Sequence, residues 1–292
     1  MRVAGAQYTV GEPADFAAFA ARIEGRVAAA AASGAGLVML PEYLALEAAA
    51  ALPQAVRGDL VRSLVALQTH LADYLALMRD LARRHAIHLV AGSFLLDVGG
   101  GRYRNRAFLF GPDGRHAWQD KLTLTGFEHA VGVFEAGDEL KVFETALGRI
   151  GIAVCYDIEF PLYARAQTEA GARLLLVPSC TDTAAGASRV RIGCQARALE
   201  NQVYVVRAVT AGSAPWSPAL KENFGAATAF TPIDRGFPSD GIAATAAAGA
   251  DWVFAELDLD LLDAFKGQAQ VANAADWHAQ LRPSVVRARV EG

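Results

Sequence analysis

Strand-like and helical patterns alternate along the first part of this 292-residue chain, and that alternation constrains the fold most. Apolar strand-like runs at residues 2–8, 37–40 and 88–95 are separated by helical patterns at residues 14–33 and 58–84. Alternation of this kind is typical of a layered α/β protein. We therefore expect the α/β fold class.

Turn signals add antiparallel pairs to this scheme. The run Gly99-Gly-Gly101 separates two strand-like runs, and Gly111-Pro-Asp-Gly114 is a second turn of the Pro-Asp-Gly type. Further patterns predict strands at residues 140–144, 174–177, 203–208, 226–230 and 252–257, and helices at residues 188–201 and 259–265. Because strand patterns continue toward the end of the chain without a linker, we predict one domain over residues 1–292, with a C-terminal extension from about residue 266.

Composition narrows the class of partner. Hydrophobic residues make up 53% of the chain, charged residues 20%, and the net charge is −4, which offers no basic surface for nucleic acid or an anionic membrane. No apolar stretch approaches ~20 residues, and Gln7, Tyr8 and Thr9 interrupt the N-terminal apolar run that a signal peptide would need. We expect a cytoplasmic protein that binds a small molecule.

Three cysteines without paired spacing suit a reducing compartment and argue against a disulfide framework or a zinc site. We expect no metal and no cofactor. Cys155 differs from the other two because the short apolar strand pattern Gly151–Val154 ends at its thiol, while Pro161 begins a helical pattern soon after. This strand-to-helix position exposes a nucleophile in other hydrolases.

A thiol with an ordinary pKa of ~8.5 needs a base or a nearby positive charge to attack at neutral pH. Glu42 follows the buried strand pattern at residues 37–40, where an unpaired carboxylate would be costly. Lys121 lies on an extended segment among apolar neighbours. A cysteine–histidine enzyme is the alternative, and His129 is the histidine that lies in a loop-like stretch near other candidates.

Three ordered motifs carry a resemblance to a known family. Leu40-Pro41-Glu42, Asp120-Lys121-Leu122 and Cys155-Tyr156-Asp157, with Phe160-Pro161 following, resemble the nitrilase superfamily of carbon–nitrogen hydrolases. The likeness extends over roughly residues 2–262. It implies a four-layer α-β-β-α sandwich, a covalent thioester mechanism without metal or cofactor, and a homodimer or higher homo-oligomer.

The resemblance also assigns roles. It implies that Cys155 attacks the substrate carbon, that Glu42 is the general base and then the proton donor, and that Lys121 stabilises the oxyanion. The backbone N–H of Tyr156 would assist Lys121. The family uses a second glutamate between its lysine and its cysteine, and Glu128 fits that position better than its rival Glu135.

The sequence gives weaker evidence for the residues that contact substrate than for the catalytic residues. Ser179, Thr181 and Asp182 follow a predicted strand, and their polar groups suit hydrogen bonding to a polar substrate. Glu159 occupies a position that is basic in many amidase-like members. We expect Glu159 to alter the substrate preference or to pair with Arg165 or Arg197.

The leading functional prediction is an amidase that converts a small amide to an acid and ammonia. Hydrolysis of a nitrile or of an N-carbamoyl amino acid would use the same three residues. A binding protein on a retired enzyme fold is the alternative from another class, and the presence of Glu42, Lys121 and Cys155 together disfavours it.

Overall fold

The first strand, β1 (Arg2–Thr9), lies in the middle of the sheet order because its six central residues are buried. In the computed structural model, which describes residues 1–291, β1 joins two sheets. Residues 2–6 pair with β2 and β13, and residues 7–9 pair with β9. The resulting strand order is β5-β4-β3-β2-β1-β9-β8-β7-β6.

Each sheet consists of one side of this order. The first contains β2 (Leu37–Leu40), β3 (His88–Gly99), β4 (Arg102–Phe110), β5 (His116–Asp120) and β13 (Trp252–Glu256). The second contains β6 (Val142–Thr145), β7 (Gly148–Ile152), β8 (Leu174–Ser179), β9 (Tyr204–Ser213), β11 (Thr228–Phe230) and β12 (Ile242–Thr245), and β10 (Glu222–Asn223) pairs with the end of β9.

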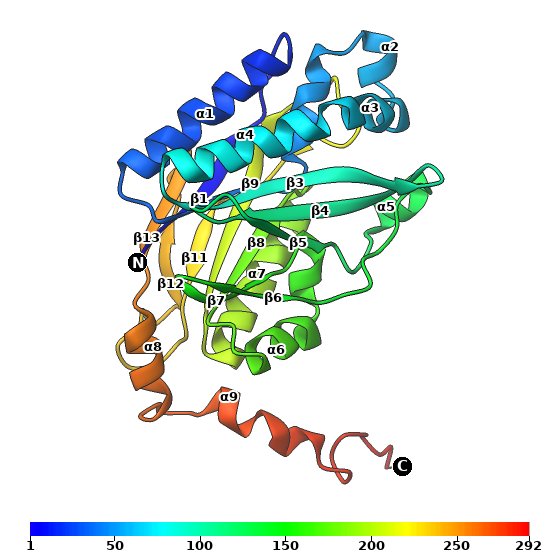
Figure 1. Ribbon diagram of the computed structural model, residues 1–292. Helices are drawn as coiled ribbons and strands as arrows, with labels where there is room; N and C mark the ends of the chain where they lie inside the picture. The colour runs from blue at the N-terminus through cyan, green and yellow to red at the C-terminus, as the bar shows by residue number, and fades with distance from the viewer. Residues whose placement is uncertain (292) are drawn as a thin grey trace.

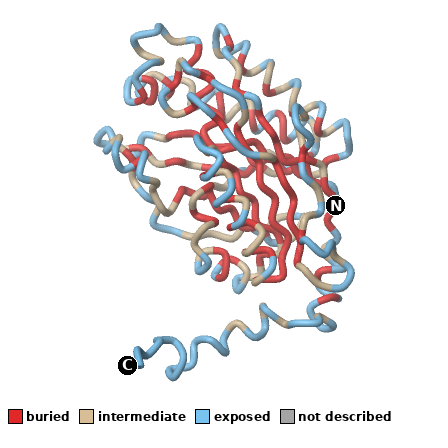
Figure 2. The backbone as a smooth tube through the Cα atoms, turned by 180° about the vertical axis from the view of Figure 1, so that it is seen from behind, coloured by how far each residue is buried: buried red, intermediate tan, exposed pale blue. Residues whose placement is uncertain are grey.

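Helices cover the outer face of each sheet (Figure 1). The helices α1 (Phe16–Ala32) and α4 (Leu71–Arg84) cover the first sheet, and α6 (Pro161–Glu169) and α7 (Ala184–Asn201) cover the second. The buried strands lie between them (Figure 2). This arrangement confirms the predicted α-β-β-α sandwich.

Two predictions about element boundaries are wrong. The helical pattern at residues 58–84 is divided into α3 (Leu60–Leu67), a 3₁₀ turn at Gln68–His70, and α4. Two short helical segments, η1 (Leu44–Ala51) and α2 (Gln54–Arg57), precede it. No helix within residues 1–291 has the length and apolarity needed to cross a bilayer.

Strands also do not continue to the end of the chain. After β13 come α8 (Leu259–Lys266), α9 (Asn273–Asp276) and a 3₁₀ turn at Trp277–Leu281, which are largely exposed (Figure 2). Arg165 of α6 holds this segment by donating to the Ala274 carbonyl at 3.0 Å and by lying over the Trp277 ring. The assignment of the chain to one domain stays a prediction.

The topology brings several strand ends to one edge of the sandwich. β2, β3, β7 and β8 run parallel to β1 or to its parallel neighbours, and β5 regains this direction because it is antiparallel to β4. The carboxyl ends of β2, β5, β7 and β8 therefore meet. Glu42, Lys121, Cys155 and Cys180 follow these ends directly or within three residues.

Gly92 allows β3 to approach the turn that carries Glu42. Its φ is +66°, and a Cβ atom there would lie 2.3 Å from the Pro41 carbonyl oxygen and 2.8 Å from the Leu44 Cβ. The neighbouring Ser93 hydroxyl accepts the Tyr43 N–H at 2.8 Å. The close approach therefore fixes the backbone on both sides of Glu42.

We predict that Gly92→Ala lowers the free energy of unfolding by roughly 2–4 kcal/mol, because it combines an unfavourable φ with a backbone clash. The matched control is Gly100→Ala, where φ is +63° but nothing lies within 4 Å of the added Cβ. The control should cost only about 1 kcal/mol. Urea unfolding of both variants measures the difference, and equal losses would contradict the steric argument.

Candidate active site

Cys155 lies on a strained turn between β7 and α6. It begins the 3₁₀ turn η3 (Cys155–Glu159) with a φ of +50°, a conformation uncommon for a residue with a side chain. Pro161 at the first position of α6 fixes the exit from this turn. The Cys155 Sγ lies 3.5 Å from the carbonyl oxygen of Cys180.

Glu42 is buried, with 1% of its surface exposed, and is held by three donors. Its Oε1 accepts the Asn105 side-chain amide at 2.8 Å and the Lys121 ammonium at 3.0 Å. Its Oε2 accepts the backbone N–H of Cys180 at 2.8 Å. A carboxylate offers about four acceptor positions, so one position on Oε2 remains available.

Glu128 is bound differently. Its Oε1 accepts the Tyr43 hydroxyl at 2.7 Å and the Lys121 ammonium at 3.0 Å. Its Oε2 accepts the backbone N–H and the hydroxyl of Thr125, the N-cap of α5 (Gly126–Val131), in a capping box. All of its acceptor positions are therefore occupied by protein donors.

Lys121 is shared between the two carboxylates. Its ammonium contacts oxygens of both Glu42 and Glu128, and its side chain is 2% exposed. The Nζ lies 3.0 Å from Glu42 Oε1, 3.0 Å from Glu128 Oε1 and 2.9 Å from Glu128 Oε2, so three acceptor oxygens surround it. Lys121 also lines the adjoining cavity.

The charges shift the pKa of each group. Burial raises the pKa of the Glu42 carboxyl, although Lys121 opposes the shift. Burial acts in the same direction on Glu128, but Lys121 and the hydrogen bonds outweigh it and hold the pKa of Glu128 below its usual value. Burial and the Glu42 charge raise the pKa of the Cys155 thiol well above its usual range. At neutral pH the thiol of Cys155 therefore keeps its proton.

Asp157 joins the cysteine turn to the segment after Lys121. Its carboxyl is 1% exposed and accepts the backbone N–H of Leu122 at 3.0 Å and of Thr123 at 2.8 Å. The nucleophile's turn and the lysine's segment are therefore tied through one side chain.

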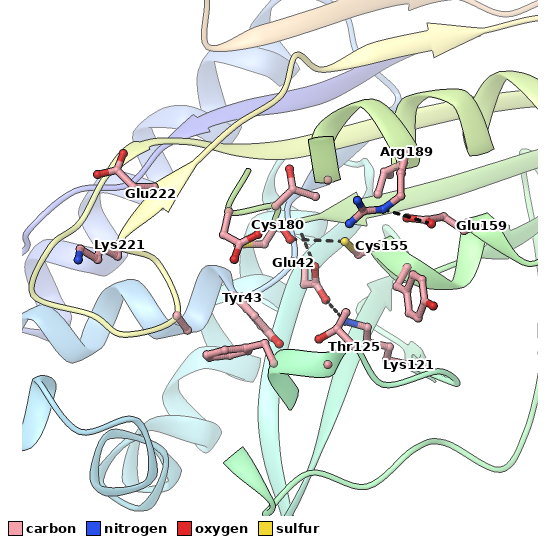
Figure 3. Close-up of a pocket in the computed structure, with 18 of the residues that line it drawn as sticks. Glu42, Tyr43, Lys121, Thr125, Cys155, Glu159, Cys180, Arg189, Lys221 and Glu222 are labelled. Atoms are coloured by element: carbon pink, nitrogen blue, oxygen red, sulfur yellow. Dashed lines mark hydrogen bonds and ion pairs between the residues drawn. The ribbon is translucent and has the colours of Figure 1, made fainter. Parts of the chain in front are cut away.

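These groups open onto a cavity of about 460 Å³ (Figure 3). Its lining includes the predicted residues Glu42, Lys121, Cys155, Tyr156, Thr181 and Asp182. Ser179 does not line it: this residue ends β8 and is 1% exposed, so its hydroxyl lies inside the fold. The Thr181 hydroxyl donates to the Phe224 carbonyl at 2.6 Å.

Other predicted partners lie elsewhere. Glu135 pairs with Arg102 and Arg104, and His129 is an exposed residue of α5, so neither lines the cavity. Between the two candidate glutamates, Glu128 is the one that contacts Lys121.

The predicted ion-pair partners of Glu159 are wrong. Glu159 Oε2 lies 3.7 Å from the Nε of Arg189, a residue of α7. The two arginines considered from the sequence instead pair on their own helices, Arg165 with Glu169 and Arg197 with Glu200.

Two donors to Glu42 were not anticipated from the sequence. They are the Asn105 amide, 63 residues away, and the Cys180 backbone N–H, 138 residues away. Within residues 1–291, no cluster of three or more His, Cys, Asp or Glu side chains is placed to hold a metal ion.

The carbon-nitrogen hydrolase family profile matches residues 2–232. The chain belongs to the carbon-nitrogen hydrolase family. It is 32% identical over 263 residues to "Probable hydrolase YhcX" of Bacillus subtilis, covering 90% of this chain and 50% of that protein. It is 26% identical over 200 residues to "Omega-amidase NIT3" of Saccharomyces cerevisiae, covering 65% of each chain.

A solved structure has the same fold. The crystal structure of Saccharomyces cerevisiae Nit3, described as a member of branch 10 of the nitrilase superfamily, superposes with a TM-score of 0.75 at 22% identity. The superposition covers 93% of this chain and 94% of that one. The chain spans half the length of the Bacillus relative and about two thirds of the yeast relative. These matches confirm the nitrilase-superfamily, amidase-like resemblance.

We predict that Asp157→Asn changes how stability depends on pH. Burial raises the pKa of Asp157 to about 7, although the N–H groups of Leu122 and Thr123 oppose this. The folded chain thus keeps a proton that the unfolded chain releases near pH ~3.9, so the group's stabilising contribution is complete below ~3.9 and is lost as the pH rises through about 7.

Asparagine stays neutral throughout. Between about pH 4 and 7 the variant's free energy of unfolding should therefore rise relative to the wild type, by at most about 1.4 kcal/mol per pH unit. Urea unfolding at a series of pH values measures this difference, with Asp182→Asn, an exposed residue of the cavity wall, as the control. A pH-independent difference for Asp157→Asn would show that its carboxyl does not titrate in this window.

Proposed function

We propose that the protein hydrolyses a small amide to an acid and ammonia through a thioester on Cys155. One observation carries the proposal. Glu42 with its free acceptor position, the Lys121 ammonium and the thiol of Cys155 line the same cavity. These are the base, the oxyanion donor and the nucleophile that acyl transfer requires.

In the first half-reaction the Cys155 sulfur attacks the amide carbon while Glu42 accepts the thiol proton. The raised pKa of Glu42 makes it a stronger base than an exposed glutamate. The carbonyl oxygen becomes an oxyanion that the Lys121 ammonium and the Tyr156 backbone N–H stabilise. Glu42 then transfers the proton to the leaving nitrogen, the C–N bond breaks, ammonia departs, and the acyl group remains on sulfur.

The second half-reaction hydrolyses the thioester. Water attacks the same carbon, Glu42 accepts a proton from that water, and the oxyanion is stabilised as before. The C–S bond breaks, Glu42 returns a proton to the sulfur, and the acid is released. Glu42 ends each cycle ionised and Cys155 ends it protonated.

Glu128 acts as a positioning residue in this scheme. Its acceptor positions are filled and its pKa is lowered, so it remains a carboxylate that holds Lys121. It has no free position from which to take a proton from the thiol.

Amides are favoured over nitriles and N-carbamoyl compounds because a relative that matches over 200 residues is named an omega-amidase. The other two substrate classes would use the same three residues. The proposal also keeps the expectation of a cytoplasmic homo-oligomer that uses no metal or cofactor.

The proposal predicts ammonia release from small amides, and its loss in Cys155→Ala. A panel of amides, nitriles and N-carbamoyl amino acids, assayed with and without a chelator, separates the substrate classes. Cys194→Ala, which removes a buried thiol of α7 away from the cavity, is the matched control. Intact-mass analysis during turnover should show an acyl adduct on the wild type and on Cys194→Ala, and none on Cys155→Ala. Ammonia release that survives in Cys155→Ala would refute the mechanism.

Glu128→Gln should lower kcat by a factor of ~100 or more, because an amide cannot hold the Lys121 ammonium as a charged acceptor. Glu135→Gln is the matched control, since Glu135 pairs with surface arginines. Turnover, acyl-enzyme accumulation and thermal unfolding should be compared in both variants. Normal turnover in folded Glu128→Gln would remove the second glutamate from the mechanism.

A further inference from the structure

Asn105 places an amide on the buried face of β4. Buried residues alternate along the first half of this strand, so Tyr103, Asn105 and Ala107 point to the same side of the sheet. Asn105 is 1% exposed. A polar side chain at such a position costs free energy unless it is hydrogen-bonded, so its partners indicate what it does.

The Asn105 side chain is directed at one carboxylate. Its Nδ2 donates to Glu42 Oε1 at 2.8 Å. Its Oδ1 is also buried, and no donor within residues 1–291 contacts it. If the amide were turned over, Oδ1 would face the carboxylate oxygen, and two acceptors repel each other. Glu42 therefore fixes the orientation of the amide.

The main chain of Asn105 holds the segment that carries Lys121. The Asn105 carbonyl accepts the N–H of Lys121 at 2.9 Å. The next pair in register, Arg106 and Asp120, forms a two-bond ion pair with distances of 2.7 and 2.9 Å. The main chain of Asn105 thus places the lysine, while its side chain contacts the glutamate. A substitution at this position can remove the side-chain contact and retain the main-chain bond.

The two oxygens of Glu42 receive different numbers of donors. Oε1 accepts the Asn105 amide at 2.8 Å and the Lys121 ammonium at 3.0 Å. Oε2 accepts the backbone N–H of Cys180 at 2.8 Å. A carboxylate oxygen has two acceptor positions, and neither an amide N–H nor an ammonium can accept a hydrogen bond. A proton on Oε1 would therefore face two donors, whereas Oε2 has a position for it.

Oε2 is also bound to the residue that contacts the thiol. The Cys180 N–H bonds Oε2, and the carbonyl oxygen of the same residue lies 3.5 Å from the Cys155 Sγ. One residue's main chain thus contacts both an oxygen of the glutamate and the sulfur. The oxygen with an open position is the one held beside the group that must lose a proton.

We propose that Asn105 is a positioning residue that directs the proton taken by Glu42 to Oε2. Its amide occupies Oε1 together with Lys121 and so leaves Oε2 as the basic oxygen. The S–H bond of Cys155 breaks as an O–H bond forms at Oε2, and the same proton then passes to the leaving nitrogen. This inference rests on the proposed amidase function and adds a residue that does not line the cavity.

The amide also affects the pKa of Glu42. The titratable groups that face this carboxyl are those of Tyr43, Lys121, Glu128, Cys155, Asp157 and Cys180. Asn105 adds a neutral donor that favours the ionised carboxylate, so its removal should raise the pKa of Glu42 further. Because Glu42 must be ionised to accept the thiol proton, activity is lost as the pH falls through this pKa. Without the amide, that loss should occur at a higher pH.

Asn105→Leu tests this expectation, because leucine has a similar volume and no side-chain N–H. The acid limb of the kcat/KM profile, measured with the small amide that the wild type hydrolyses fastest, should move to higher pH by about 1 to 2 units. This is the shift expected when a charged group loses one hydrogen bond. Asn105→Asp has the same size and replaces the donor with an acceptor, so it should also move the limb to higher pH.

Gln119→Leu is the matched control. Gln119 is a buried amide on β5 whose Nε2 donates to the carbonyls of Asp120 and Glu139, at 2.9 and 2.7 Å. Its acid limb should coincide with that of the wild type, even if thermal unfolding shows a loss of stability. An unshifted limb in a folded Asn105 variant, or an equal shift in Gln119→Leu, would overturn the inference.

Neutron diffraction separates this inference from the proposed function, because it requires no turnover. Crystals of the wild type, examined at successively lower pD until Glu42 carries a deuteron, should show that deuteron on Oε2. A deuteron on Oε1 would refute the role of Asn105 even if the protein hydrolyses amides. If the deuteron lay on Oε2 and the wild type released ammonia from no amide, the amidase proposal would fail and the role of Asn105 would stand.

Discussion

An ammonium shared between two buried carboxylates is the interaction on which the candidate site depends. Lys121, Glu42 and Glu128 are each at most 2% exposed, so none of them gains much from water. Taking such charges out of water costs several kcal/mol per ion, and only mutual attraction and added hydrogen bonds offset this. The cluster carries one more negative than positive charge, which explains why neutral donors surround both acids. It also holds together segments from β2, β5 and α5.

The two carboxylates differ because of how many donors each receives. Glu128 has protein donors at every acceptor position and a lowered pKa, whereas Glu42 keeps one position on Oε2 and has a raised pKa. Counting acceptors thus separates a group that can take a proton from one that can only hold a cation. Proximity to Lys121 alone would not separate them, since the Lys121 Nζ lies 3.0 Å from an oxygen of each.

The sequence predicted the residues that end strands better than it predicted what surrounds them. Glu42, Lys121 and Cys155 could be found because each follows an apolar strand pattern, and parallel strands bring such ends to one edge. Asn105 and the Cys180 N–H could not be found, because their contacts with Glu42 depend on the register of strands far apart in the chain. A backbone N–H donor also cannot be recognised from the sequence, because every residue except proline has one.

The wrong predictions for Glu159 and Ser179 have the same cause, because both depend on how distant elements pack. Glu159 was expected to pair with Arg165 or Arg197, but α7 places Arg189 3.7 Å from it. Ser179 was grouped with Thr181 and Asp182 because all three follow one strand pattern. The strand continues through Ser179, so its side chain stays inside the sandwich.

The buried Asp157 maintains the strained backbone conformation of Cys155. Cys155 adopts a φ of +50°, which an unconstrained cysteine would leave. Asp157, two residues later, is anchored to the backbone after Lys121, so relaxation of the turn would break hydrogen bonds to Leu122 and Thr123. The conformation that points the sulfur toward the cavity is therefore maintained by the segment that also places the ammonium. In the proposed reaction, the nucleophile and the group that stabilises the oxyanion would hold their relative position without either side chain contacting the other directly.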